Sequence, residues 1–137
     1  VQGFLIKYIL AWLGPARTAV LGLCLDVVAL TGIALATEGW MVYALMPVAA
    51  LSALVAPALQ GLMSNKIPDD AQGELQGALT SVSALAMIIA PLMMTSSFAA
   101  FTGEDAPIYL PGAPFLLSAV LVLLSIALFM RHRGAKA

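Results

Sequence analysis

Asp26 is the residue of this sequence that is best placed for proton chemistry. It is the only charged residue between Arg17 and Glu38, and it lies eight residues beyond Thr18, where an apolar segment begins. In an α-helix eight residues rise by roughly 12 Å, a depth from which so short a side chain cannot reach water. An ionised carboxylate near the bilayer centre costs about 2.5–3.5 kcal/mol on insertion scales. We therefore expect a carboxyl group that can bind and release a proton.

Small residues share the predicted helix face of Asp26. At heptad-like spacing from it lie Ala19, Gly22, Ala29 and Ala36, with Ile33 as the exception. Such a stripe indicates a face that packs against other helices, not against lipid. Two interpretations of the carboxyl group remain open. It is either a functional ionisable group or a structural one that is hydrogen-bonded within the bundle.

Three further polar residues are candidates for contact with a ligand or for a gate. Gln60 follows Pro57 by three residues, and a buried amide at a proline kink can bind either a ligand or a neighbouring helix. Glu74 and Gln76 lie in the segment 73–77, which opens the next apolar stretch. The positive end of a helix dipole favours Glu74 at the membrane rim, where it is a possible cytoplasmic gate. The small residues Gly73, Gly77 and Ser81 are four residues apart, a spacing that predicts a helix face packed closely against another helix.

Residue types that soluble enzymes need are scarce. The single cysteine, Cys24, excludes an internal disulfide framework, and the single histidine, His132, lies near the C-terminus. Nucleotide-binding loops, hydrolase elbows and zinc-protease motifs are absent from the sequence. We expect no enzyme activity, no catalytic residue, no metal, no cofactor and no nucleic-acid partner.

The elements that must hold these residues are membrane-spanning helices. Of the 137 residues 62% are hydrophobic and only 9% are charged, whereas about a quarter of a soluble domain is charged. A spanning helix needs roughly 20 mostly apolar residues. The sequence predicts such spans at 18–36, 40–64, 75–98 and 110–130, joined by polar turns that include 14–17. Residues 1–13 are too short for a span and are predicted to end a truncated helix, so the chain reads as a fragment.

The charges predict how the spans are oriented. All Lys and Arg residues fall on one side of the predicted topology, whereas the other side carries only acids. The basic residues are Lys7, Arg17, Lys66, Arg131, Arg133 and Lys136, and the acids opposite are Glu38, Glu104 and Asp105. By the positive-inside rule the basic side, with the C-terminus, is cytoplasmic.

Several stretches, in order, resemble the tetracycline-resistance branch of the major facilitator superfamily. They are Thr18-Ala19-Val20-Leu21-Gly22, Gly39-Trp40, Pro57-Ala58-Leu59-Gln60-Gly61-Leu62-Met63-Ser64 and Gln72-Gly73-Glu74-Leu75-Gln76-Gly77. The first stretch and Asp26 are similar to the ninth helix of those drug:proton antiporters, which carries an aspartate there. Gln2 resembles a glutamine of their eighth helix. The resemblance implies an all-α membrane fold that comprises the end of helix 8 and helices 9–12, within the C-terminal six-helix half.

The resemblance also implies a function. A transporter of this kind exports an amphipathic small molecule while protons enter, by alternating access between two halves in the bacterial inner membrane. Asp26 would be its ionisable transport residue, Gln2 a pocket residue, and Gln60 and Gln76 members of the matching motifs. The N-terminal six-helix half would be the partner of this chain, and the lipid bilayer its surroundings. Two alternatives are a structural or interaction module of the membrane and a superfamily importer of a small nutrient.

Overall fold

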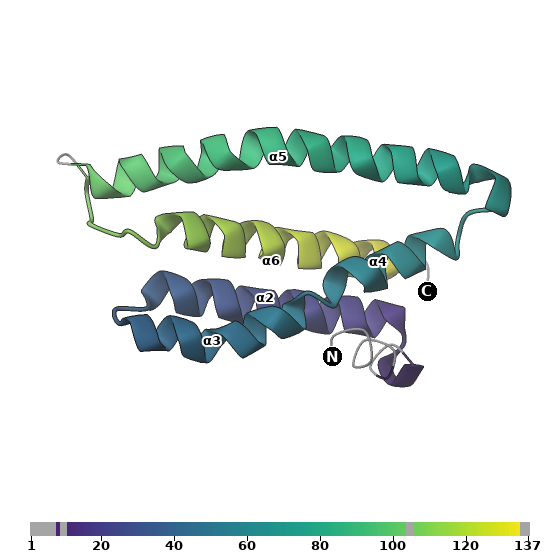
Figure 1. Cartoon of the computed structure of the whole chain (residues 1–137), viewed down its shortest axis with the longest axis horizontal. Coiled ribbons are helices and arrows are strands. Elements are labelled where there is room, and N and C mark those ends of the chain that lie inside the picture. Colours follow the sequence, from purple (N-terminus) through teal and green to yellow (C-terminus); the bar gives the residue numbers. More distant parts are fainter. Residues whose placement is uncertain (1–7, 9–10, 104–105, 135–137) are drawn as a thin grey trace.

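The computed structural model describes residues 8, 11–103 and 106–134, and within them the fold is built from helices without any strand. Its elements in chain order are α2 (Pro15–Leu35), α3 (Gly39–Ser52), α4 (Val55–Ser64), the short 3₁₀ helix η1 (Asp69–Ala71), α5 (Gln72–Thr102) and α6 (Ala113–Gly134). Figure 1 shows the chain reversing direction between α2 and α3, between α4 and α5, and between α5 and α6, whereas α4 continues in the general direction of α3. The expectation of an all-α fold is confirmed.

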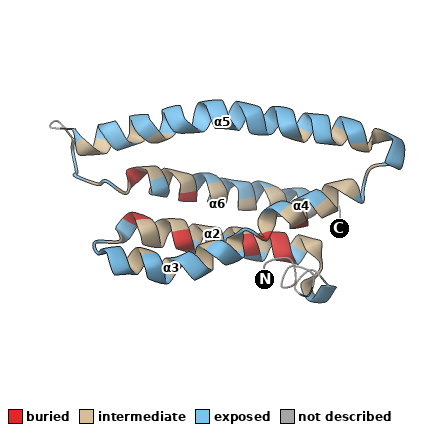
Figure 2. Cartoon of the chain, viewed as in Figure 1, coloured by how far each residue is buried: buried red, intermediate tan, exposed pale blue. Residues whose placement is uncertain are grey.

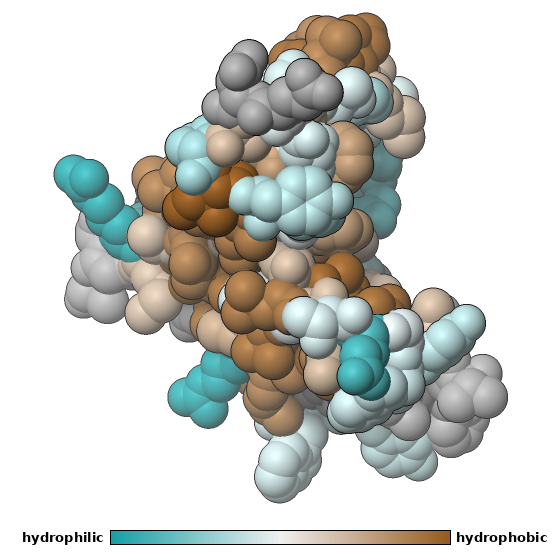
Figure 3. Space-filling model, turned by 90° about the vertical axis from the view of Figure 1, so that its left-hand side faces the viewer, coloured by the Kyte–Doolittle hydropathy of each residue, from teal (hydrophilic) through white to brown (hydrophobic). Residues whose placement is uncertain are grey.

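Within the described residues, four helical segments are long and apolar enough to cross a membrane, judged by length and composition. They are Pro15–Leu35, Gly39–Ser64, Asp69–Thr102 and Ala113–His132. Apolar side chains accordingly remain on the outside of the molecule. Figure 3, viewed from the end with the turn between α2 and α3, shows brown apolar residues reaching the surface among paler and hydrophilic ones. Lipid is the solvent in which such a surface is stable.

Helix α2 is the centre of the bundle, because it packs against α3, α4 and α6. Its buried positions are occupied by small side chains, among them Ala19 and Ala29, whose exposed fractions are 0% and 1%. Gly22 is buried as well, whereas Ala36 is half-buried. The buried positions appear in red along α2 in Figure 2. The predicted packing face is therefore confirmed over most of its length, and it allows the backbones of the helices to approach closely.

Helix α6 meets α2 at a point where no side chain fits. A Cβ atom added to Gly112, directly before α6, would collide with the backbone of Ala34. Ala113 and Ala119 continue this contact as buried residues of α6. The close approach fixes the start of α6 against the end of α2.

The predicted span 40–64 corresponds to the membrane-length segment Gly39–Ser64, within which the helix is broken in two. Helix α3 ends at Ser52, and α4 begins at Val55. Pro57 has no N–H group and so cannot bond the carbonyl group four residues earlier, at Ala53. At the break itself, the amide N–H of Leu54 bonds the carbonyl oxygen of Leu51, three residues earlier, at 3.2 Å. This spacing is tighter than that of an α-helix.

Helix α5 is the least covered helix of the described chain. None of its residues is buried, as the pale blue of Figure 2 shows. Gly73 and Gly77 have no atoms within 4 Å of an added Cβ. The face that they were predicted to form with Ser81 therefore packs against no other helix at these two glycines within the described part of the chain.

Several helix ends differ from the sequence prediction. Pro15 and Ala16 were assigned to a turn but form the first turn of α2, a position where the fixed φ of proline favours a helix. Helix α5 extends the predicted 75–98 at both ends. Helix α6 begins later than 110 and runs to Gly134, so Arg131 and His132 belong to a helix and not to a tail. Of the predicted segment 1–13, only residues 8 and 11–13 are described, and they are helical.

Candidate functional site

The carboxyl group of Asp26 is paired with a hydroxyl group from another helix. The Ser52 Oγ donates a hydrogen bond to Asp26 Oδ1 across 2.9 Å. Asp26 is half-buried and is the twelfth of the 21 residues of α2, close to the middle of that span. Ser52 is the last residue of α3. The pair therefore joins the centre of one apolar helix to the point where another helix breaks.

Ser52 has two acceptors within reach but a single proton. Its Oγ lies 2.8 Å from the Ala49 carbonyl oxygen as well as 2.9 Å from Asp26 Oδ1. A hydroxyl group donates one hydrogen bond and accepts up to two. With an ionised Asp26, Ser52 can donate to the carboxylate. With a protonated Asp26, the carboxyl O–H can donate to the Ser52 Oγ while Ser52 donates to Ala49, so the site offers a partner in both protonation states.

A close helix contact positions this pair. Gly22 lies one helical turn before Asp26, and a Cβ added there would lie 2.6 Å from the Val55 Cγ2. The same Cβ would lie 3.5 Å from the Ser52 carbonyl oxygen. The missing side chain at Gly22 therefore lets the break between α3 and α4 lie directly on α2. This contact holds Ser52 beside Asp26.

The other predicted site residues do not share this environment. Gln60 on α4 and Gln76 on α5 are both exposed, and no hydrogen bond joins either side chain to the described residues. Glu74 is an exposed residue in the first turn of α5. Gln2 lies outside the described residues. Among the described residues of the predicted set, only Asp26 has a polar partner on another helix.

Two polar residues with clear structural partners were not singled out from the sequence. One is Ser52, whose only signal was a hydroxyl group in an apolar span shortly before Pro57. The other is Gln72, whose Nε2 donates to the carbonyl oxygens of Ser64, at 3.0 Å, and Ile67, at 3.1 Å. The Ser64 Oγ donates back to Gln72 Oε1 at 2.9 Å. Gln72 thus clamps the loop between α4 and α5.

Comparison with known proteins finds relatives among tetracycline resistance proteins and hippocampus abundant transcript proteins. No protein-family model matches the chain, and no solved structure matches it. Tetracycline resistance protein class G from Vibrio anguillarum is 32% identical over 130 residues, which are 95% of this chain and 32% of that protein. The class C protein from Escherichia coli is 36% identical over 87 residues, 64% of this chain and 22% of that protein. Hippocampus abundant transcript-like protein 1 from Mus musculus is 30% identical over 145 residues, 94% of this chain and 29% of that protein. The chain thus spans about a third of the length of the curated relatives it matches.

Proposed function

From the premise that this chain belongs to the tetracycline-resistance-type family of the major facilitator superfamily, we propose that it is part of a proton-coupled drug exporter. The transporter works by alternating access and exchanges an amphipathic drug for protons across the bacterial inner membrane. The observation that carries the proposal is the hydrogen-bonded pair of Asp26 and Ser52 in the middle of an apolar helix. Ionisable groups at that depth are costly, and they typically mark ion pathways and proton relays.

Asp26 is the group that takes up and releases the proton in this proposal. Proton coupling requires a carboxyl group that is tolerated both charged and neutral. Ser52 meets this requirement, because it can donate to the carboxylate or accept from the carboxyl group while it donates to Ala49. The break between α3 and α4 at Ser52 supplies an element that can reorient when the proton leaves.

Substrate contact is assigned to the polar residues that the bundle leaves free. Gln60 and Gln76 are exposed and have no hydrogen bond to the described residues, so their amide groups are available to a substrate. Gln2 is proposed for the same path because it resembles a glutamine on the eighth helix of the family. Glu74, at the exposed start of α5, is proposed as a gate on the cytoplasmic side. The uncovered face of α5 is the surface that the N-terminal six-helix half occupies.

The basic ends of the helices are assigned to the cytoplasm. Three basic residues lie at the end of the bundle at which α5 begins (Figure 1). They are Arg17 in the first turn of α2, Lys66 after α4 and Arg131 in the last turn of α6. Glu38 lies at the opposite end, before α3. The positive-inside rule then places the C-terminus in the cytoplasm. A reporter fused after residue 137 that is active only in the periplasm would contradict this orientation.

Substitution of Asp26 tests the function. In the full-length transporter, Asp26→Asn removes the ionisable carboxyl group but keeps the size of the side chain and one hydrogen-bond acceptor. We expect loss of proton-driven drug accumulation in everted vesicles at unchanged expression, and partial retention in Asp26→Glu. Asp26→Asn with undiminished proton-driven transport would exclude Asp26 from coupling.

A structural role of Asp26 is the second candidate, because the same bond to Ser52 joins two helices. The two roles differ in what the Asn variant changes. If Asp26 serves only structure, Asp26→Asn lowers the stability of the purified protein, and transport falls only in proportion to the folded fraction. If Asp26 couples protons, transport is lost from a variant that unfolds at nearly the same denaturant concentration as the parent.

A further inference from the structure

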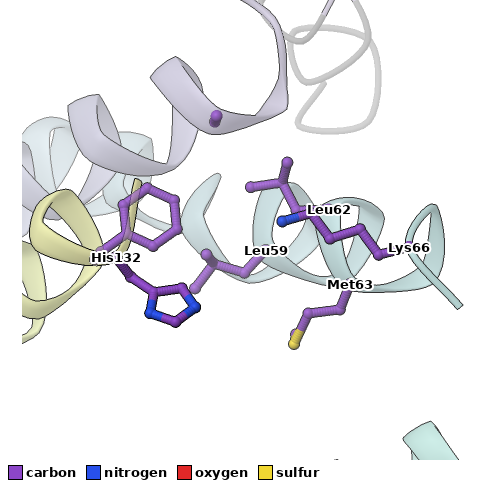
Figure 4. Close-up of a pocket in the computed structure, with 7 residues that line it drawn as sticks. Leu59, Leu62, Met63, Lys66 and His132 are labelled. Atoms are coloured by element: carbon purple, nitrogen blue, oxygen red, sulfur yellow. The ribbon is translucent and has the colours of Figure 1, made fainter. Parts of the chain in front are cut away.

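An apolar cavity opens at the end of the bundle where three helix ends meet. It has a volume of about 430 Å³ and is lined by Ala16 of α2, by Leu59, Leu62 and Met63 of α4, by Lys66, and by Phe129 and His132 of α6. Figure 4 shows His132 and Lys66 on opposite sides of the group, with Leu59 between them. None of these residues takes part in the Asp26–Ser52 pair.

The lining combines two chemistries in one place. Five of the seven lining residues are apolar, and none of the seven is acidic. Lys66 supplies a full positive charge, and the imidazole ring of His132 supplies an N–H donor. The first turn of α2 adds the positive end of a helix dipole beside Ala16. The ligand that complements such a cavity has an anionic head and an apolar body.

The loop that carries Lys66 is held in place. Gln72 bonds the carbonyl oxygens on both sides of it, at Ser64 and Ile67. The backbone N–H of Lys66 itself donates to the carbonyl oxygen of Met63 at 3.1 Å. The base of the lysine side chain is therefore fixed, and less conformational entropy is lost when its ammonium group binds an anion.

We propose that this cavity binds an anionic phospholipid of the surrounding membrane, such as phosphatidylglycerol. Its phosphodiester group lies between Lys66 and His132, and the upper part of one acyl chain lies along Leu59, Leu62 and Phe129. The depth fits this ligand, because the cavity lies where α2 begins and where α4 and α6 end, at the level of lipid headgroups. Basic pockets between transmembrane helices are known to hold anionic headgroups.

The lining favours a lipid over free inorganic phosphate. Phosphate would satisfy Lys66 but would leave the apolar walls formed by α4 and α6 without a partner. A lipid satisfies both, and it is present wherever the protein is inserted. The proposal is independent of Asp26 and of the direction of transport, so it stands or falls separately from the proposed function.

Native mass spectrometry of the purified full-length transporter tests the proposal. The protein is titrated with phosphatidylglycerol and, in parallel, with phosphatidylcholine of the same acyl chains. We expect one phosphatidylglycerol to bind in preference to phosphatidylcholine. Lys66→Ala should weaken this binding about fivefold, the factor that corresponds to about 1 kcal/mol per basic residue near anionic lipid. Lys66→Arg should retain it.

Arg131→Ala is the matched control. It removes one positive charge from the same helix end as His132, but Arg131 does not line the cavity. Equal affinity for both lipids, or an equal loss in Lys66→Ala and Arg131→Ala, would overturn the proposal. Displacement of the lipid by millimolar inorganic phosphate would overturn it as well, in favour of a phosphate site.

A second measurement needs no substitution. A phosphatidylglycerol with a photoactivatable group near the head of one acyl chain is incorporated into membranes that contain the unmodified transporter. We expect crosslinks to residues 59–66 and 129–132. Crosslinks confined to α5, or none at these segments because another part of the protein fills the cavity, would refute the assignment.

Discussion

The hydroxyl group of Ser52 provides the sharpest test of the proposed proton site. Ser52→Ala removes one atom, leaves the apolar span intact and takes away the hydrogen bond of 2.9 Å to Asp26 Oδ1. Side-chain hydrogen bonds within membrane proteins contribute about 0.6 kcal/mol on average and at most about 1.7 kcal/mol. Because one partner is a carboxyl group and both residues are only half-buried, we expect a value within that range.

This free energy sets the size of the expected defect. If the bond stabilises the arrangement in which Asp26 exchanges its proton, its loss slows exchange by roughly three- to eighteenfold. Proton-driven drug uptake into everted vesicles that contain the full-length transporter measures this factor. Ser52→Thr keeps the hydroxyl group and should retain most of the activity. Ser125→Ala is the matched control, because the Ser125 hydroxyl group is exposed and bonds only the carbonyl oxygen of Leu121, at 2.9 Å.

A double-mutant cycle separates the interaction between Ser52 and Asp26 from the general effect of each substitution on packing. Unfolding in mixed micelles gives the stability of Ser52→Ala, of Asp26→Ala and of the double variant. We expect a coupling free energy of about 0.6–1.7 kcal/mol between the two residues. Full transport by Ser52→Ala, or a coupling free energy near zero, would refute the view that Ser52 serves the carboxyl group.

Three further predictions concern the contacts that hold the site and the loop. Gly22→Ala should destabilise the bundle by about 1 kcal/mol, because the new Cβ lies 2.6 Å from Val55, and Val55→Ala in the same chain should restore most of the stability in micelle unfolding. Gly112→Ala should cost more, up to about 3 kcal/mol, because the obstacle is backbone of α2, and no side-chain truncation should rescue it in the same assay. Gln72→Ala removes two donated hydrogen bonds, so it should lower the stability of the protein by about 1–2 kcal/mol and speed proteolysis of the loop after α4. Gln76→Ala is the control: its side chain has no hydrogen bond to the described residues, so the cleavage rate should not change.

The sequence predicted the kind of fold because the bilayer imposes a simple requirement on length and composition. A span needs roughly 20 apolar residues, and this chain has such segments separated by polar turns. The stripe of Ala19, Gly22 and Ala29 also predicted the packed face of α2, since residues at that spacing share one side of a helix. The helix ends were less accurate, at Pro15 and beyond Met130 above all, because a helix continues as far as its backbone bonds allow and not only as far as its residues are apolar.

The sequence also placed Asp26 in the middle of an apolar segment, and this depth follows from counting residues along one helix. Its partner could not be found by counting. Ser52 lies 26 residues away, and whether it reaches Asp26 depends on how α3 is rotated, where it breaks and how closely Gly22 lets it approach α2. The cavity of Lys66 and His132 likewise exists only because three helix ends meet. Depth in the membrane is set by local composition, whereas contacts between helices are set by the packing of many small residues at once, which only the tertiary structure decides.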